Sequence, residues 1–146
     1  MKTHELKLDV KYFDDVKSGK KNFEIRNNDR DFQVGDILEL KAYVKGLKKF
    51  AKWGEIIDPF NHFRMSHNYM TCAEEDADTI KVKVVYVLSA NDVNEGIEFM
   101  SGDETAHATI NGQVLVLSQV EEVLKKYLNV ERIPENYVVL GIEVVR

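Results

Sequence analysis

The chain has 146 residues, of which 44% are hydrophobic and 31% are charged, a balance typical of one globular domain and not of a disordered or fibrous chain. Its single cysteine, Cys72, excludes an internal disulfide framework, and no apolar run reaches the length of a membrane span. The N-terminus lacks the apolar stretch of a signal peptide, so we expect a cytoplasmic protein. We also expect a monomer without a cofactor.

The net charge of -5 is divided unevenly along the chain. Residues 1–53 carry +4 and residues 54–146 carry -9. A basic first half could meet an anionic partner while the acidic half keeps the protein in solution. The alternative is two solvated surfaces that bind nothing.

The first elements expected are a strand and a helix. Leu6 and Leu8 alternate with charged residues, which predicts a half-buried strand over residues 3–8. Asp9 is suited to cap a short helix and Gly19 to end it. The buried stripe of this helix is formed by Val10, Phe13 and Val16.

A second strand is expected over residues 22–26. Phe23 and Ile25 face the core in this pattern. Glu24 and Arg26 then share the opposite, polar face.

A turn signal at residues 34–36 precedes a third strand, whose apolar residues alternate from Leu38 to Val44. Residues 45–78 lose this period. Because a structureless loop of that length is unusual in a compact domain, we expect a helical turn or two there, or a mobile functional loop. Residues 79–88 again alternate clearly and predict a strand.

The last third of the chain is expected to hold a loop over residues 91–108, with a short helix near residues 97–99. Asn111-Gly112 predicts a tight turn. Ser118 and Glu121 form a capping-box pattern that opens an amphipathic helix over residues 118–128.

The final strand is expected over residues 137–145. Mostly consecutive short strands favour an α+β fold built on a small barrel or curled sheet over a parallel doubly wound sheet.

One segment resembles a known family. The residues from Gly19 to Arg26 fit the G-x-K-x-x-E-x-R signature of ASCH domains, and the segments around them resemble a bacterial and phage branch that is DUF3850-like. The supporting segments are Tyr12-Phe13, Asn28-Asp29-Arg30, residues 32–36 and residues 137–142. The similarity covers residues 3–44, 79–90 and 135–145, and leaves 45–78 and 91–134 as insertions.

The resemblance implies a single ASCH/PUA-like domain over residues 1–146. Its fold would be a small mixed β-barrel of about five or six strands, with one short N-terminal helix and one later helix in an insertion. It also implies a cleft beside the first helix that recognises RNA or a nucleotide. Some relatives are amidohydrolases that act on N4-acetylcytidine, and others are ribonucleases.

Four residues around the signature form the predicted ligand site: Lys21, Glu24, Arg26 and Arg30. Arg26 can hold a phosphate with two parallel hydrogen bonds, and Glu24 can accept from an exocyclic amine. If the cleft is catalytic, Lys21 and Glu24 are the candidate catalytic residues. The alternative is an ion-pair cluster that only pins the turn.

The amidohydrolase chemistry fits this chain less well. As the resemblance implies, those relatives use a threonine nucleophile beside the lysine, and this chain has Glu24 at that position. Thr79 or Ser89 could supply a hydroxyl instead, and Glu143 could supply the distant carboxylate.

A second candidate region is rich in lysine and aromatic residues and has no acidic residue between Lys41 and Trp53. Cations that track a backbone and rings that stack on bases are typical of single-stranded nucleic acid binding. The residues assigned to this interface are Lys41, Lys45, Lys48, Lys49 and Trp53. The alternative is a solvated loop whose rings pack on the barrel.

A third candidate, a metal site, is not favoured. His62, His67 and Cys72 are five residues apart, whereas zinc ligands come in closer pairs and no fourth ligand is evident.

The sequence therefore predicts an RNA- or nucleotide-binding module that uses the cleft beside the first helix. The alternative is an amidohydrolase on an N4-acylated cytidine, or a ribonuclease, in the same cleft. A third reading is a phage or mobile-element protein that binds a protein partner through its insertions.

Overall fold

The structure, a computed structural model, describes residues 1–53, 56–57, 64–65, 69–99, 103 and 105–146. The chain divides into two compact units. Unit 1 comprises Met1–Lys2, Asn22–Asp36 and Lys83–Glu143, and unit 2 comprises Thr3–Lys21, Ile37–Val82 and Val144–Arg146. Strands β8 and β11 each contribute residues to both units.

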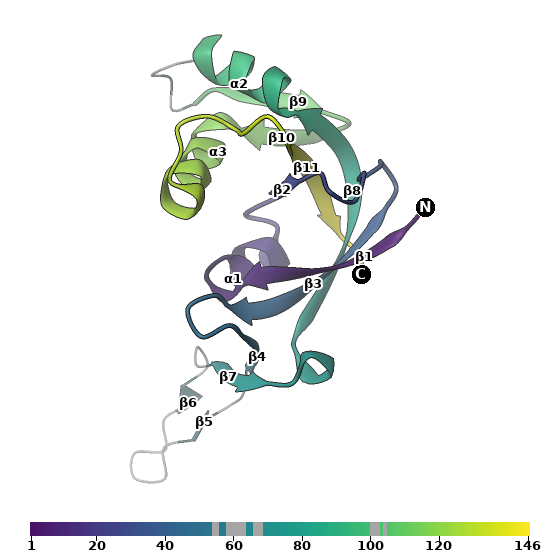
Figure 1. Cartoon of the computed structure of the whole chain (residues 1–146), viewed down its shortest axis with the longest axis vertical. Helices are drawn as coiled ribbons and strands as arrows, with labels where there is room; N and C mark the ends of the chain where they lie inside the picture. The colour runs from purple at the N-terminus through teal and green to yellow at the C-terminus, as the bar shows by residue number, and fades with distance from the viewer. Residues whose placement is uncertain (54–55, 58–63, 66–68, 100–102, 104) are drawn as a thin grey trace. The chain divides into compact units, whose positions relative to one another are not determined.

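Unit 2 is a sheet with one helix beside it (Figure 1). β1 pairs in parallel with β3, and the β3–β4 and β4–β7 pairs are antiparallel. A short pair, β5 with β6, belongs to the same unit. The elements are β1 (Thr3–Asp9), α1 (Val10–Ser18), β3 (Ile37–Val44), β4 (Lys49–Trp53), β5 (Ile56–Ile57), β6 (Arg64–Met65), β7 (Tyr69–Cys72), the 3-10 turn η1 (Glu74–Asp76) and the first part of β8 (Thr79–Ser89).

The local sequence explains the start of unit 2. The Asp9 carboxylate accepts a hydrogen bond from the Lys11 N–H at 2.9 Å, which satisfies one of the free donors of the first turn of α1. Gly19 follows the helix with φ 85°, a conformation that glycine adopts without steric cost. Phe13 and Val16 are buried as predicted.

Unit 1 places two helices and a hairpin on strands of the sheet (Figure 1). Its strands follow the hydrogen-bonded order β2-β11-β8, with β2 and β11 antiparallel. β9 and β10 pair separately through an Asn111-Gly112 turn in which both residues have positive φ, as the sequence predicts. The elements are β2 (Phe23–Asn27), the rest of β8, α2 (Ala90–Phe99), β9 (His107–Ile110), β10 (Gln113–Val116), α3 (Leu117–Val123), its π-helical continuation η2 (Leu124–Leu128) and β11 (Tyr137–Val144).

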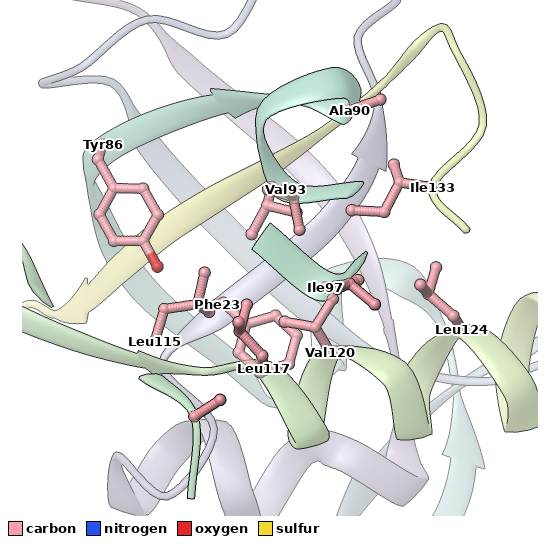
Figure 2. Packing of buried hydrophobic residues seen from close by; sticks show 12 residues of the cluster. Phe23, Tyr86, Ala90, Val93, Ile97, Leu115, Leu117, Val120, Leu124 and Ile133 are labelled. Carbon is pink, nitrogen blue, oxygen red and sulfur yellow. The ribbon is translucent and has the colours of Figure 1, made fainter. Parts of the chain in front are cut away.

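The core of unit 1 lies between its strands and its helices (Figure 2). Phe23 from β2 and Tyr86 from β8 meet side chains of α2 and α3 there. The Tyr86 ring covers Gly141 of β11 so closely that an added Cβ would lie 2.0 Å from its Cε2 atom. The helix and hairpin residues of the cluster are Ala90, Val93, Ile97, Leu115, Leu117, Val120 and Leu124.

Several expectations need correction. The described strands give one seven-stranded sheet in the order β2-β11-β8-β3-β4-β7 with β1 on β3, more strands than the five or six expected. Residues 45–78 hold a helical turn, η1, as expected. They also contribute β4 and β7 to this sheet, which the sequence did not predict, with Ala51 fully buried. The α+β class is confirmed, and closure of the sheet into a barrel stays a prediction.

The helices also differ from the expectation. α2 begins at Ala90, well before residues 97–99, because Ala90, Val93 and Ile97 form a buried stripe that the polar residues between them obscure in the sequence. The prediction that Ser118 caps this helix is wrong. α3 begins at Leu117, and its N-cap residue, Val116, makes no side-chain hydrogen bond to the helix. In the described part of the chain, no helix is long and apolar enough to cross a membrane.

Candidate functional site

The first part of the signature belongs to unit 2 and follows the end of α1. The Lys21 N–H donates to the Asp15 carbonyl oxygen at 2.9 Å, which fixes the backbone just after the Gly19 turn. The Lys21 side chain is only 8% exposed, and its Nζ lies 5.2 Å from the centre of the Tyr12 ring. This is a cation–π contact, which helps to hold a buried ammonium group. Tyr12 was not among the predicted site residues. The sequence feature that could have indicated it is an aromatic residue on the predicted helix just before Lys21.

The second part of the signature belongs to unit 1 and lies on β2. The Nε and Nη2 atoms of Arg26 each lie 2.9 Å from Oε2 of Glu24. The Glu24 side chain is 5% exposed and the Arg26 side chain 23%. The two side chains share one strand face, as predicted, and form a charge-assisted pair.

Glu24 is buried, although the sequence predicts its face of β2 to be polar. The residue opposite Glu24 on β11 is Leu140, which is 0% exposed, and the residue opposite Arg26 is Val138 at 8%. This face of β2 is therefore packed, and the carboxylate is held among apolar neighbours. Burial of a charge is costly unless it is paired and hydrogen-bonded, and Arg26 provides that pairing.

The fourth residue of the predicted ligand site, Arg30, is exposed in the turn that follows β2 in unit 1. In the same turn, the Asn28 side chain accepts from the Phe32 N–H at 3.0 Å, and Phe32 is buried. Arg30 therefore projects from a turn that is itself anchored. The structure brings Glu24 and Arg26 together, and the predicted cleft that would unite all four residues stays a prediction.

Lys41, assigned to the lysine-aromatic interface, lies in unit 2 between two carboxylates. Its Nζ is 3.5 Å from Oε1 of Glu5 and 3.4 Å from Oε1 of Glu74. Burial lowers the pKa of Lys41, but these two carboxylates together raise it by more, so the net pKa lies above its usual value. Its charge is already matched by acidic neighbours, and its role in binding stays a prediction.

The aromatic rings of the lysine-aromatic region point to two different faces. The Trp53 ring packs on Phe13 of α1 at 4.5 Å and on Tyr69 at 6.1 Å between ring centres. The Trp53 N–H also donates to Oδ2 of Asp78 at 2.8 Å. This indole is part of the packing of unit 2. For Trp53, the structure therefore agrees with the alternative in which the rings of this region pack against the rest of the fold.

The lysines of the same region lie at the β3–β4 turn. Lys45, Lys48 and Lys49 are all exposed, and Lys48 adopts φ 53° in the turn itself. The turn therefore presents three ammonium groups on a short segment of chain.

The other sequence candidates have local partners or lie elsewhere. The Thr79 hydroxyl donates to the Ala77 carbonyl at 3.1 Å, and the Ser89 hydroxyl accepts from the Asp92 N–H at 3.2 Å. Both hydroxyls thus serve local turns. His62 and His67 lie outside the described residues, and within the described ones no cluster of three potential metal ligands occurs.

Comparison with known proteins places the chain in a family. Residues 3–101 match the family model described as a domain of unknown function, DUF3850. The chain belongs to the DUF3850 family. The DUF3850 match contains the whole signature and the lysine-aromatic region, whereas α3 and β11 follow it in the chain.

Two individual proteins resemble this DUF3850 chain. The "uncharacterized 12.9 kDa protein in GpA 3'region" of Escherichia phage P2 is 50% identical over 46 residues, which are 32% of this chain and 42% of the phage protein. The match thus spans less than half of that relative. The crystal structure of the hypothetical protein PH0355 covers 98% of this chain and 99% of its own, with 19% identity and a TM-score of 0.45. Neither name assigns a function.

Proposed function

We propose that this DUF3850 protein is an ASCH-type, PUA-like module that binds RNA or a nucleotide through its signature residues. Arg26 holds a phosphate, and Glu24 orients Arg26 and accepts from a base amine. Lys21 and Arg30 add positive charge on either side of this pair in the sequence. The likeness of the signature to ASCH domains supports the ligand class.

The observation that carries the proposal is the ion pair that Arg26 forms with the buried Glu24. Within the described residues, the buried polar or charged side chains are His4, Lys21, Glu24 and Asp36, and two of these four belong to the signature. A buried ion pair contributes little net stability, since apolar residues of the same size often serve as well or better. A role in ligand binding accounts for its presence among apolar neighbours.

The pair is also suited to the chemistry of a nucleotide. A guanidinium has five N–H donors in a planar fork, so it can hold a carboxylate and a phosphate at the same time. The carboxylate fixes the plane of the fork before the ligand arrives, which lowers the entropic cost of binding. Arg26 keeps 23% of its side chain exposed, so an anion can reach it from solvent.

Hydrolysis is the weaker reading of the same residues. Glu24 brings no hydroxyl nucleophile, and its carboxylate is already engaged by Arg26. If the wild type hydrolyses N4-acetylcytidine and the Lys21→Ala variant does not, the hydrolase interpretation is restored.

A titration with a conservative variant tests the proposal. The probes are a labelled pool of single-stranded RNAs of mixed sequence, each 12 nucleotides long, and, separately, free nucleotides. Both are titrated at low and at moderate salt. Arg26→Lys keeps the charge but removes the fork, and we expect affinity to fall by about tenfold. Lys17→Ala removes an exposed charge of α1 and serves as the control, with affinity within about twofold of wild type.

Salt dependence gives a second readout. Affinity should fall steeply with salt, because each phosphate contact releases counterions. Arg26→Lys binding with wild-type affinity would show that the fork does not hold the ligand.

A further inference from the structure

Unit 2 carries a second surface suited to nucleic acid, on the outer face of its sheet. β1, β3 and β4 each alternate between buried and solvent-facing residues. The buried side includes Leu8, Ala42 and Ala51, all at most 2% exposed. The opposite side carries Lys7, Tyr43, Phe50 and Lys52.

Two aromatic rings form the centre of this outer face. Tyr43 and Phe50 are directly opposite each other in the β3–β4 pair. Their ring centres are 5.2 Å apart at an interplanar angle of 67°, an edge-to-face arrangement. Lys7 of β1 places its Nζ 4.7 Å from the centre of the Tyr43 ring. Both rings are half-buried, so they offer part of their surface to solvent while the sheet fixes their positions.

The charge around these rings is complementary to a polyanion. The β3–β4 turn adjoins the ring pair and carries the exposed Lys45, Lys48 and Lys49. No acidic residue occurs between Lys41 and Trp53, and the carboxylates of Glu5 and Glu74 pair with Lys41. The carboxylate of Asp9, which lies beside Tyr43 in the β1–β3 register, accepts from the Lys11 N–H. Exposed positive charge is thus concentrated at the turn end of the hairpin.

We propose that the outer face of the β3–β4 hairpin binds single-stranded RNA, with bases stacked on Tyr43 and Phe50 and phosphates held by the turn lysines. Rings on a sheet face and adjoining cations are the combination by which proteins hold single strands. This proposal rests on the proposed function, because it takes RNA as the ligand. In this proposal the stacking residues are Tyr43 and Phe50, and not Trp53, whose ring packs on Phe13.

Ring variants that preserve apolar bulk test the stacking. Phe50→Leu and Tyr43→Leu remove the aromatic surface but leave a side chain that suits a partly buried strand position. With a fluorescein-labelled 12-residue oligouridylate as probe, each variant should bind about 5- to 100-fold more weakly. Phe99→Leu, which changes a ring 86% exposed on α2 in unit 1, is the matched control and should bind like wild type.

The lysines are tested by the salt slope. Lys48→Asn with Lys49→Gln removes two charges, and Asn tolerates the positive φ of residue 48. The slope of log affinity against log salt should become shallower by about 1.4, because each single-strand contact contributes about 0.7. Lys125→Gln, an exposed lysine of η2, should leave the slope unchanged.

Parallel titrations separate this proposal from the proposed function. If Arg26→Lys weakens oligouridylate binding and the two ring variants do not, the signature binds RNA and the hairpin proposal is overturned. If the ring variants lose affinity while Arg26→Lys binds like wild type, the hairpin proposal stands and the signature proposal fails. A wild-type protein that does not bind the oligomer at all overturns both.

Discussion

The close approach of Tyr86 to Gly141 makes the effect of one added methyl group predictable. In Gly141→Ala, the new Cβ would lie 2.0 Å from Cε2, 2.2 Å from Cδ2 and 2.5 Å from Cζ of Tyr86. Ordinary contacts between carbon atoms are about 3.5–4.0 Å, so the ring must retreat by well over 1 Å. Tyr86 is 3% exposed within the cluster between β8, α2 and α3, where the packed side chains leave the ring little room to move.

The cost follows from the two ways the protein can respond. Forcing extra volume into a packed core costs about 1–3 kcal/mol, and expelling a large aromatic side chain costs about 3–5 kcal/mol. We therefore expect Gly141→Ala to lower the free energy of unfolding by about 3 kcal/mol. For a chain of this size the loss corresponds to a fall in Tm of about 10 °C, measurable by circular dichroism on heating or in urea.

Two controls isolate the clash. Gly46→Ala adds the same methyl group where no atom lies within 4 Å, and it should change stability by less than about 0.5 kcal/mol. In a Tyr86→Leu background the ring is gone, so Gly141→Ala should cost less than about 1 kcal/mol. An unchanged Tm for Gly141→Ala, or an equal cost in both backgrounds, would refute the packing of Tyr86 on Gly141.

Two further predictions concern buried polar groups. Burial raises the pKa of Tyr86 to about 12, so the stability it contributes is complete below about pH 10 and is lost as pH rises toward 12. The free energy of unfolding should fall by about 2–3 kcal/mol over that window in wild type and less in Tyr86→Phe, as urea titrations at each pH can show. Asp36 is 2% exposed and accepts from the Lys2 N–H at 3.0 Å and the Gln33 N–H at 3.1 Å. Asp36→Ala should therefore cost about 2–3 kcal/mol in urea denaturation, and a cost below about 0.5 kcal/mol would contradict its anchoring role.

The parts of the fold that the sequence predicted correctly depend on short-range physics. The alternation in β8 and the Asp9 cap of α1 need only neighbours in the chain, so the pattern alone located them. The Asn111-Gly112 turn is of the same kind. Only the end of α2 was predicted, near residues 97–99, because its buried stripe is interrupted by four polar or charged residues and by Gly96.

The site could be predicted only in part, because burial depends on the partner strand. Alternation assigned Glu24 and Arg26 to one face of β2 correctly, but it could not reveal that this face is buried, as Leu140 beside Glu24 is. The lysine-aromatic segment shows the same limit. Trp53 and Phe50 are both aromatic residues of β4, and only the positions of α1 and β3 decide that one packs inward and the other outward.

The most direct test of the proposed function separates the ion pair from the fold. Glu24→Leu with Arg26→Met replaces both charges by apolar residues of similar size, so neither member of the pair is left without the other, and the variant should keep or raise the Tm. Binding of the mixed 12-residue RNA pool and of free nucleotides is then titrated against wild type. The account predicts a folded protein whose affinity has fallen by at least about tenfold. A folded double variant that binds both ligands as wild type does would show that the pair is only structural.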